Sequence, residues 1–190
     1  MISRSFPLLS ALLLALQPIA AQEMPKPQVE HEKLAQSIGT WDAVIGSFGM
    51  DGKWQTSKGV SVQKIGPGGF WLIDDFTGEC MGAKCTGNGA LGYDPIKKAY
   101  VQSSVFSMSP LLMVWSGNFD KTGKVLTMTG EAPGMDGTMV KMRKVTTWAS
   151  ADSMTIEVFT VMPDGKEHKS MTLACTRRTE KTAENAGAKK

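Results

Sequence analysis

The stretch MTIEVFTVMPDGKEHKSMTLACTRR, residues 154–178, decides the fold. Two runs rich in β-branched and apolar residues flank Asp164-Gly165, a dipeptide typical of tight hairpin turns. In the second run the odd positions from Met171 to Cys175 are apolar, and the residues between them are small or polar. Because side chains alternate across a strand, this pattern predicts a hairpin whose odd-numbered face packs inward, with Arg177 on the same inner face.

The same pattern extends toward the N-terminus. Strand-like runs are separated by turns such as Asp51-Gly52 and Asp136-Gly137, and a single short helix at 31–38 precedes them. A meander of so many strands leaves two exposed edges unless it closes. We therefore expect an all-β fold, an antiparallel up-and-down barrel of about 8–10 strands with a short N-terminal helix. The expected strands are residues 41–48, 53–65, 70–79, 99–108, 111–119, 124–131, 138–148, 154–162 and 166–178.

The N-terminus predicts export. Arg4 precedes an apolar run of roughly eleven residues and a small-residue cleavage pattern that ends at Ala21. The run is shorter than the roughly 20 apolar residues that cross a bilayer, so we expect a cleaved signal peptide at 1–21 and not a membrane anchor. The mature protein is then periplasmic or secreted, with an extended lead-in at 22–29, a barrel domain at 30–178 and a polar tail at 179–190.

The composition limits the partners. Apolar residues make up 42% of the chain and charged residues 21%, which is enough apolar material for a packed core. The 21 basic and 18 acidic residues are dispersed and leave a net charge of +3, so no basic face for nucleic acid is expected. We likewise expect no integral membrane segment in the mature protein, because no later apolar run is long enough.

Three cysteines fall into two classes. Cys80 and Cys85 flank four residues that fit a hairpin tip, which would place the two thiols opposite each other. In an oxidising compartment this spacing predicts a disulfide, with two free thiols as the alternative. Cys175 is expected to be a small buried apolar residue on the last strand.

No catalytic or metal constellation is recognisable. Asp74 and Asp75 are adjacent in a strand and point to opposite faces, so they cannot act as a pair; the inward one either orients a ligand or is a paired structural acid. Glu157 allows the same two interpretations. Of the two histidines, His168 lies beside a turn and is expected to be solvated, and haem binding through it is the minor alternative.

The run Gly87-Asn88-Gly89-Ala90-Leu91-Gly92 has the letters of a dinucleotide-binding fingerprint. That fingerprint requires a helix immediately after it, and Tyr93-Asp94-Pro95 cannot begin a long one. We therefore expect a Gly-rich connection between strands here.

Gly39-Thr40-Trp41 opens the first expected strand, and in a closed meander the first and last strands are neighbours. Arg177 on the last strand can therefore stack on Trp41. This pair looks like the closing signature of lipocalin or calycin barrels.

A longer set of motifs is spread over nearly the whole expected domain: Val29-Glu30-His31, Leu34, Gly39-Thr40-Trp41, Gly68-Gly69-Phe70-Trp71, Met81-Gly82, the run 87–95, Tyr100-Val101, Glu157, Asp164-Gly165-Lys166-Glu167, Met171 and Arg177. In these motifs the chain resembles the bacterial family called domain of unknown function 1579. That family brings no established activity with it. The sequence departs from the family pattern at Ser104 and Phe106, where a Trp and an Asp are usual, and at Cys175, which replaces an aromatic residue.

Together these features predict an exported barrel that binds a small apolar molecule and does no chemistry on it, without a cofactor. The 13 Met and five Trp residues supply soft apolar volume for a pocket. A cavity of a few hundred Å³ would favour this function, and a packed interior would favour the alternative, a filled barrel that acts as an interaction module of the cell envelope. An enzyme or a haem-linked protein is the third possibility. The expected lining of the pocket is drawn from Trp71, Tyr93, Phe106, Met113, Trp115, Met128 and Met142.

Overall fold

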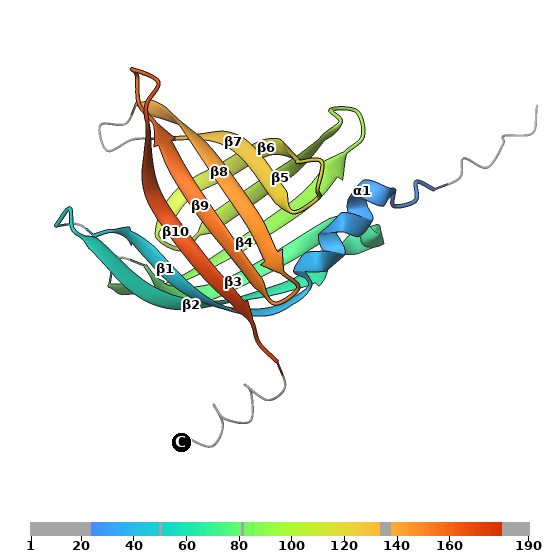
Figure 1. Ribbon diagram of the computed structural model, residues 1–190, viewed down its shortest axis with the longest axis horizontal. Helices are drawn as coiled ribbons and strands as arrows, with labels where there is room; N and C mark the ends of the chain where they lie inside the picture. The colour runs from blue at the N-terminus through green and yellow to red at the C-terminus, as the bar shows by residue number, and fades with distance from the viewer. Residues whose placement is uncertain (1–23, 50, 81, 134–137, 180–190) are drawn as a thin grey trace, which may run out of the picture.

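The computed structural model describes residues 24–49, 51–80, 82–133 and 138–179. It is a closed antiparallel barrel in which every strand pairs with its neighbours in sequence and β1 pairs with β10 (Figure 1). This is the up-and-down barrel that the hairpin pattern predicts. The ten strands are β1 (Gly39–Phe48), β2 (Trp54–Ile65), β3 (Trp71–Cys80), β4 (Ala83–Asp94), β5 (Ala99–Phe106), β6 (Ser109–Phe119), β7 (Val125–Pro133), β8 (Met139–Ser150), β9 (Ser153–Val161) and β10 (Glu167–Arg177).

Some of the predictions from the sequence concern residues that the structure does not describe. The signal peptide expected at 1–21, most of the tail expected at 179–190 and the turn at 136–137 lie outside the described residues. Met81, part of the family resemblance, lies outside them as well.

Strand β4 corrects the expectation of a Gly-rich connection at 87–92. The run is part of β4 and pairs with β3 on one side and β5 on the other. A Cβ atom at Gly87 would lie 2.5 Å from Cδ1 of Phe106, and one at Gly92 would lie 2.4 Å from Cε3 of Trp71. These glycines therefore accommodate aromatic rings from the adjacent strands, which is why a glycine-rich run remains a strand.

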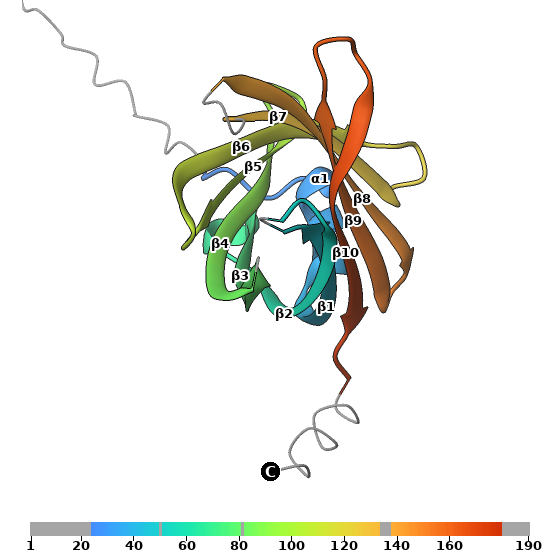
Figure 2. The same cartoon turned by 90° about the vertical axis from the view of Figure 1, so that its left-hand side faces the viewer.

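One end of the barrel is covered by the N-terminal segment (Figure 2). The single helix expected at 31–38 is in fact a short α-helix, α1 (Val29–Glu32), followed by a 3-10 helix, η1 (Lys33–Ser37). Leu34 is fully buried at this end, and the hydroxyl of Tyr100 donates to the carbonyl of Glu30 at 2.9 Å. A second 3-10 turn, η2 (Pro67–Gly69), joins β2 to β3. No helix among the described residues is long and apolar enough to cross a membrane.

The two ends of the barrel differ in how well they are filled. Near the helix, the inward side chains of Trp41, Leu126 and Met154 are at most 2% exposed. At the opposite end, which carries the β1–β2, β3–β4 and β9–β10 hairpins, the inward residue Phe106 is 39% exposed and Met142 is half-buried. We call the first the closed end and the second the wide end.

Candidate functional site

The closed end is held by Arg177 and Trp41, which strand parity predicts to be neighbours. The two residues pair directly across β10 and β1, and the guanidinium carbon lies 4.2 Å from the centroid of the indole ring. The Trp41 indole donates from Nε1 to the carbonyl of Ser37 at 2.8 Å, and Arg177 donates from Nη2 to the carbonyl of Gln36 at 2.8 Å. Both side chains thus fasten η1 to the barrel.

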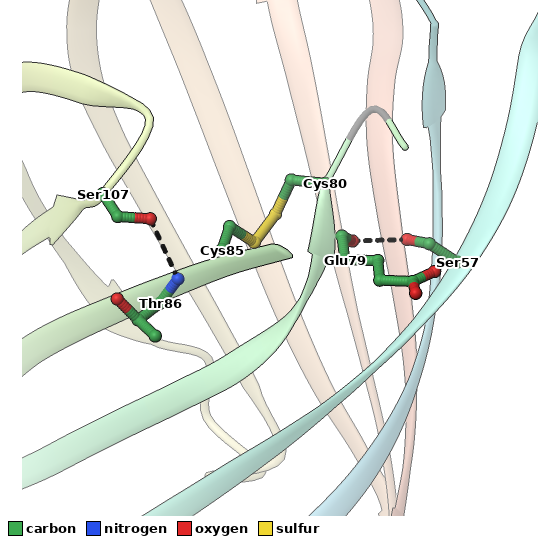
Figure 3. The surroundings of a disulfide bond; sticks show 6 residues. All are labelled: Ser57, Glu79, Cys80, Cys85, Thr86 and Ser107. Carbon is green, nitrogen blue, oxygen red and sulfur yellow. Dashed lines mark hydrogen bonds between the residues drawn. A yellow bond between two sulfur atoms is a disulfide. The ribbon is translucent and has the colours of Figure 1, made fainter. Parts of the chain in front are cut away.

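A disulfide joins Cys80 and Cys85 at the wide end, with their Cα atoms 5.9 Å apart. Figure 3 shows the bridge between the last residue of β3 and the third residue of β4. Beside it the Ser57 hydroxyl donates to the Glu79 carbonyl at 2.7 Å, which ties β2 to the same hairpin (Figure 3). Cys175 is free and buried, as its place on the inner face of β10 predicts.

The middle of the barrel contains a cluster of inward polar side chains, which is the candidate site. Alternation along β3 turns Asp74 inward, and alternation along β8 turns Lys144 inward, between Met142 and Thr146 on the same face. The Ser61 hydroxyl on β2 donates to Asp74, and the Lys144 ammonium donates to Oε1 of Gln102 on β5. Lys144 Nζ also lies 4.8 Å from the centroid of the Trp115 ring.

Burial shifts the titration of both charged members of this cluster. Lys144 is 9% exposed, and removal from water lowers its pKa to about 7, an effect that the carboxylate of Asp74 partly offsets. Desolvation raises the pKa of Asp74, against the lowering effect of its hydrogen bond from Ser61. No ion pair joins the two groups among the described residues, and for each of them the effect of burial on the pKa exceeds the opposing effect of the other's charge.

A cavity of about 70 Å³ lies between these side chains. Trp148 lines it, and the buried indole Nε1–H of this residue has no hydrogen-bond partner within the described part of the chain. One buried water needs about 10–15 Å³, so the cavity has room for about five water-sized groups. Its lining combines polar and apolar side chains: Ser37, Gln63, Leu72, Asp74, Gly89, Leu91, Gln102, Leu126, Lys144, Thr146, Trp148, Met154 and Ile156.

None of the seven residues expected to line a pocket borders this cavity. Trp71 is wrong for an interior position, because it lies on the outer face over Gly92. Tyr93 is packed at the closed end, with its ring 5.8 Å from that of His31. The remaining five point inward elsewhere. Phe106, Met113 and Met142 lie toward the wide end, and Trp115 and Met128 are buried in the core.

The size of the cavity also differs from the expectation. A volume of about 70 Å³ is well below the few hundred Å³ of a pocket for a larger apolar ligand. The cavity extends toward the closed end, where Ser37, Leu126 and Met154 border it, and its lining is partly polar.

The other candidate residues lie outside this cluster. Asp75 points outward and accepts a hydrogen bond from Asn88 at 2.6 Å, while Glu157 forms an ion pair with Lys169. His31 is buried and accepts a hydrogen bond at Nδ1 from the Gln28 amide at 2.9 Å. His168 is exposed on β10. Over the described ranges, no three His, Cys, Asp or Glu side chains are grouped as a metal site would require.

A second concavity lies on the outer surface of the barrel. It is an open groove of about 1230 Å³ across β10, β1, β2, β3 and β4. Beyond it, the exposed rings of Phe48 and Trp54 meet edge to face at 5.1 Å. The outward side chains of the groove are short or charged: Asp42, Val44, Thr56, Lys58, Val60, Thr77, Glu79, Lys84, Thr86, Ala174 and Thr176.

Lys144, Gln102 and Trp148 were not among the site residues predicted from the sequence. The available signal was strand parity, because in β8 Lys144 shares its face with Met142 and Trp148. A lysine on the inward face of a strand is unusual, so Lys144 could have been identified by the same parity argument that identified Arg177. Gln102 carries no such signal, since a glutamine is common on either face of a strand.

No curated protein matches this chain closely enough to count as a relative. Among solved structures, the S-type phycobiliprotein lyase CPES from Guillardia theta is similar with a TM-score of 0.49 and 11% identity, over 81% of this chain and 99% of that chain. The sequence pattern of the family described as "Protein of unknown function (DUF1579)" matches residues 26–177. This match spans every strand of the barrel, and the chain therefore belongs to the DUF1579 family.

Proposed function

We propose that the barrel binds a small molecule in the cavity beside Lys144. The ligand that this cavity favours has a few non-hydrogen atoms, an oxygen that accepts hydrogen bonds and a short apolar part. The observation that carries the proposal is the buried Nε1–H of Trp148, which has no partner in the described part of the chain and lines the same cavity as Lys144.

Buried donors without acceptors are unfavourable, because they have lost their hydrogen bonds to water. An ammonium or amine at Lys144 has further donor capacity beyond its bond to Gln102. A carbonyl or carboxylate oxygen in the cavity would accept from Lys144 and Trp148 together. Such an oxygen converts an incomplete polar cluster into a satisfied one.

The rest of the lining is suited to a short hydrocarbon segment. Leu72, Leu126 and Met154 are buried against the cavity, and Ile156 borders it from β9. The ligand is then amphipathic and smaller than the apolar molecule that the sequence alone predicts. We expect it to enter from the wide end, past the half-buried side chains of Met113 and Met142.

We also propose that the protein acts outside the cytoplasm, after its signal peptide has been cleaved following Ala21. The order of charged, apolar and small residues at the N-terminus supports this, as does a disulfide of the kind that persists in oxidising compartments. The intact mass of protein recovered from a periplasmic or secreted fraction tests it. A mature protein that retains Met1 would contradict cleavage.

The binding site can be tested through its indole groups. The five Trp residues give separate Nε1–H signals in a ¹H–¹⁵N NMR spectrum, and Trp148→Phe identifies the signal of Trp148. Titration with propionate, a short carboxylate, should shift that signal saturably. Trp54 and Trp71 lie on the outer face and serve as internal controls.

The outcome separates this function from the alternative of an interaction module. If propionate and other short carbonyl compounds leave the Trp148 signal unchanged, the interior site is wrong. The outer groove, whose lining combines apolar side chains such as Val44 and Val60 with charged ones such as Lys58 and Glu79, would then be the better candidate.

A further inference from the structure

We propose that Lys144 captures a small aldehyde or ketone as an imine, an inference that rests on the proposed small-molecule site. Lys144 borders the cavity together with Asp74, and no ion pair joins the two side chains among the described residues. A carbonyl compound placed between them would have a nucleophile on one side and a proton donor on the other.

The first requirement for this step is a neutral amine. An exposed lysine is almost entirely protonated at neutral pH, because its ordinary pKa is about 10.4. Desolvation lowers the pKa of Lys144 to about 7, so a large fraction of this amine carries a free electron pair. Its Nζ is held by Gln102 and by the ring of Trp115, which fixes its position at the cavity wall.

The second requirement is polarisation of the carbonyl group. The Nε1–H of Trp148 has no hydrogen-bond partner among the described residues, so it can donate to a ligand oxygen. A donor that is already in place stabilises the negative charge that develops on this oxygen during the attack. The apolar side chains of Leu72 and Ile156 would contact the alkyl part of the ligand.

The step balances without an external oxidant or reductant. The Nζ electron pair attacks the carbonyl carbon, and a proton moves from nitrogen to oxygen to give a carbinolamine. Asp74, whose pKa is raised by burial, then donates its proton to the hydroxyl group, which leaves as water. The product is a protonated imine at Lys144 beside the carboxylate of Asp74, and hydrolysis reverses the sequence.

Reductive trapping tests the proposal on the mature protein. Propanal is added with sodium cyanoborohydride, which reduces an imine to a stable secondary amine, and modified lysines are located by peptide mass mapping. At pH 7 we expect Lys144 to be propylated at least about tenfold faster than exposed Lys121, because the amine of a lysine with a lowered pKa is far less protonated. The rate at Lys144 should rise through about pH 7, the pKa of its amine.

Matched variants assign the roles. Lys144→Arg keeps a long basic side chain that does not form an imine, and this variant should lose only the adduct at residue 144. Asp74→Asn retains the shape of the side chain and should slow trapping by roughly 10²-fold, the usual contribution of a positioned acid.

The result that overturns the inference is modification of Lys121 with none at Lys144. The propionate titration in the same preparation separates the two proposals. If propionate shifts the Trp148 signal and propanal leaves Lys144 unmodified, the binding function stands and the imine is wrong. If neither effect is seen, both proposals fail.

Discussion

The guanidinium of Arg177 lies over the ring of Trp41, 4.2 Å from carbon to centroid, and donates to main-chain carbonyls of two separate segments. One is Gln36 in η1, and the other is Ala151 in the turn between β8 and β9, at 2.9 Å from Nε. A single side chain on the last strand therefore connects the first strand, the helical segment and a distant turn.

Truncation of this side chain should loosen the closed end. We expect Arg177→Ala to lower the free energy of unfolding by about 1–3 kcal/mol, through lost cation–π contact, packing and hydrogen bonds. Arg177→Lys keeps the charge but cannot donate to the same set of carbonyls. Its free energy of unfolding should therefore lie between those of the wild type and Arg177→Ala. Urea denaturation gives the free energy of unfolding of all three proteins. An Arg177→Ala variant that unfolds at the same urea concentration as the wild type would contradict the role of Arg177 at the closed end.

The cysteines should titrate in two classes. Without reductant, the unfolded protein should expose one reactive thiol, that of Cys175, because Cys80 and Cys85 are joined. The folded protein should expose none, since burial raises the pKa of the Cys175 thiol to about 12. Replacement of both bridged cysteines by serine should lower stability by about 2 kcal/mol, the effect of a short closed loop. Three reactive thiols in the unfolded state would show that the bridge is absent.

The parts of the fold that follow from neighbouring residues in the sequence could be predicted, and the parts that depend on contacts between distant strands could not. Hairpin turns and strand parity are local, so they predict the closed meander, the bridge at the tip of β3 and β4, and the inward position of Arg177. Strand β4 was missed because its glycines are explained by the rings of Phe106 and Trp71, which belong to other strands. Local pattern cannot show which ring lies over which glycine.

The interior site was harder to predict for the same reason. Parity places Lys144 inward, but the partners of Lys144 come from β5 and β6, far away in sequence. The prediction that Trp71 lines the interior was wrong because β3 is apolar on both faces, so composition does not show which face of β3 is the inner one. The volume left between side chains depends on packing throughout the barrel, and no local pattern contains it.

Replacement of Lys144 by an apolar residue of similar length should stabilise the protein in a pH-dependent way. The folded pKa is about 7 and an unfolded lysine has a pKa of about 10.4, so the unfolded chain binds more protons between these values. The wild type is therefore penalised most below pH 7 and gains stability as pH rises through this window. The advantage of Lys144→Met should reach a few kcal/mol near pH 6 and shrink toward pH 10, at about 1.4 kcal/mol per pKa unit.

Urea denaturation at several pH values measures this difference. Asp74 is present in both proteins, and its raised pKa acts in the opposite sense, with stability lost as pH rises from 3.8. Lys121→Met, at an exposed position, is the control and should show no such trend. A difference between Lys144→Met and the wild type that is constant with pH would contradict the burial of this amine.

Trp148→Phe should separate stability from binding. The variant removes a buried donor that has no partner among the described residues, which offsets the packing lost with part of the ring, so the stability of the unliganded protein should change by no more than about 1 kcal/mol. Binding of propionate should weaken by roughly tenfold, the value of one hydrogen bond to a charged group. Thermal denaturation and isothermal titration calorimetry give the two numbers. A variant that binds propionate as well as the wild type would exclude the indole from the site.

The most direct measurement is an NMR titration of the Lys144 side chain, observed at ¹³Cε, with Lys144→Arg to identify its signal. We predict a pKa near 7 in the free protein, because the amine is desolvated. In saturating propionate the pKa should rise, because a carboxylate beside the amine favours its charged form. A free-protein pKa at the ordinary lysine value of about 10.4, unmoved by propionate, would contradict both the buried site and the ligand that we assign to it.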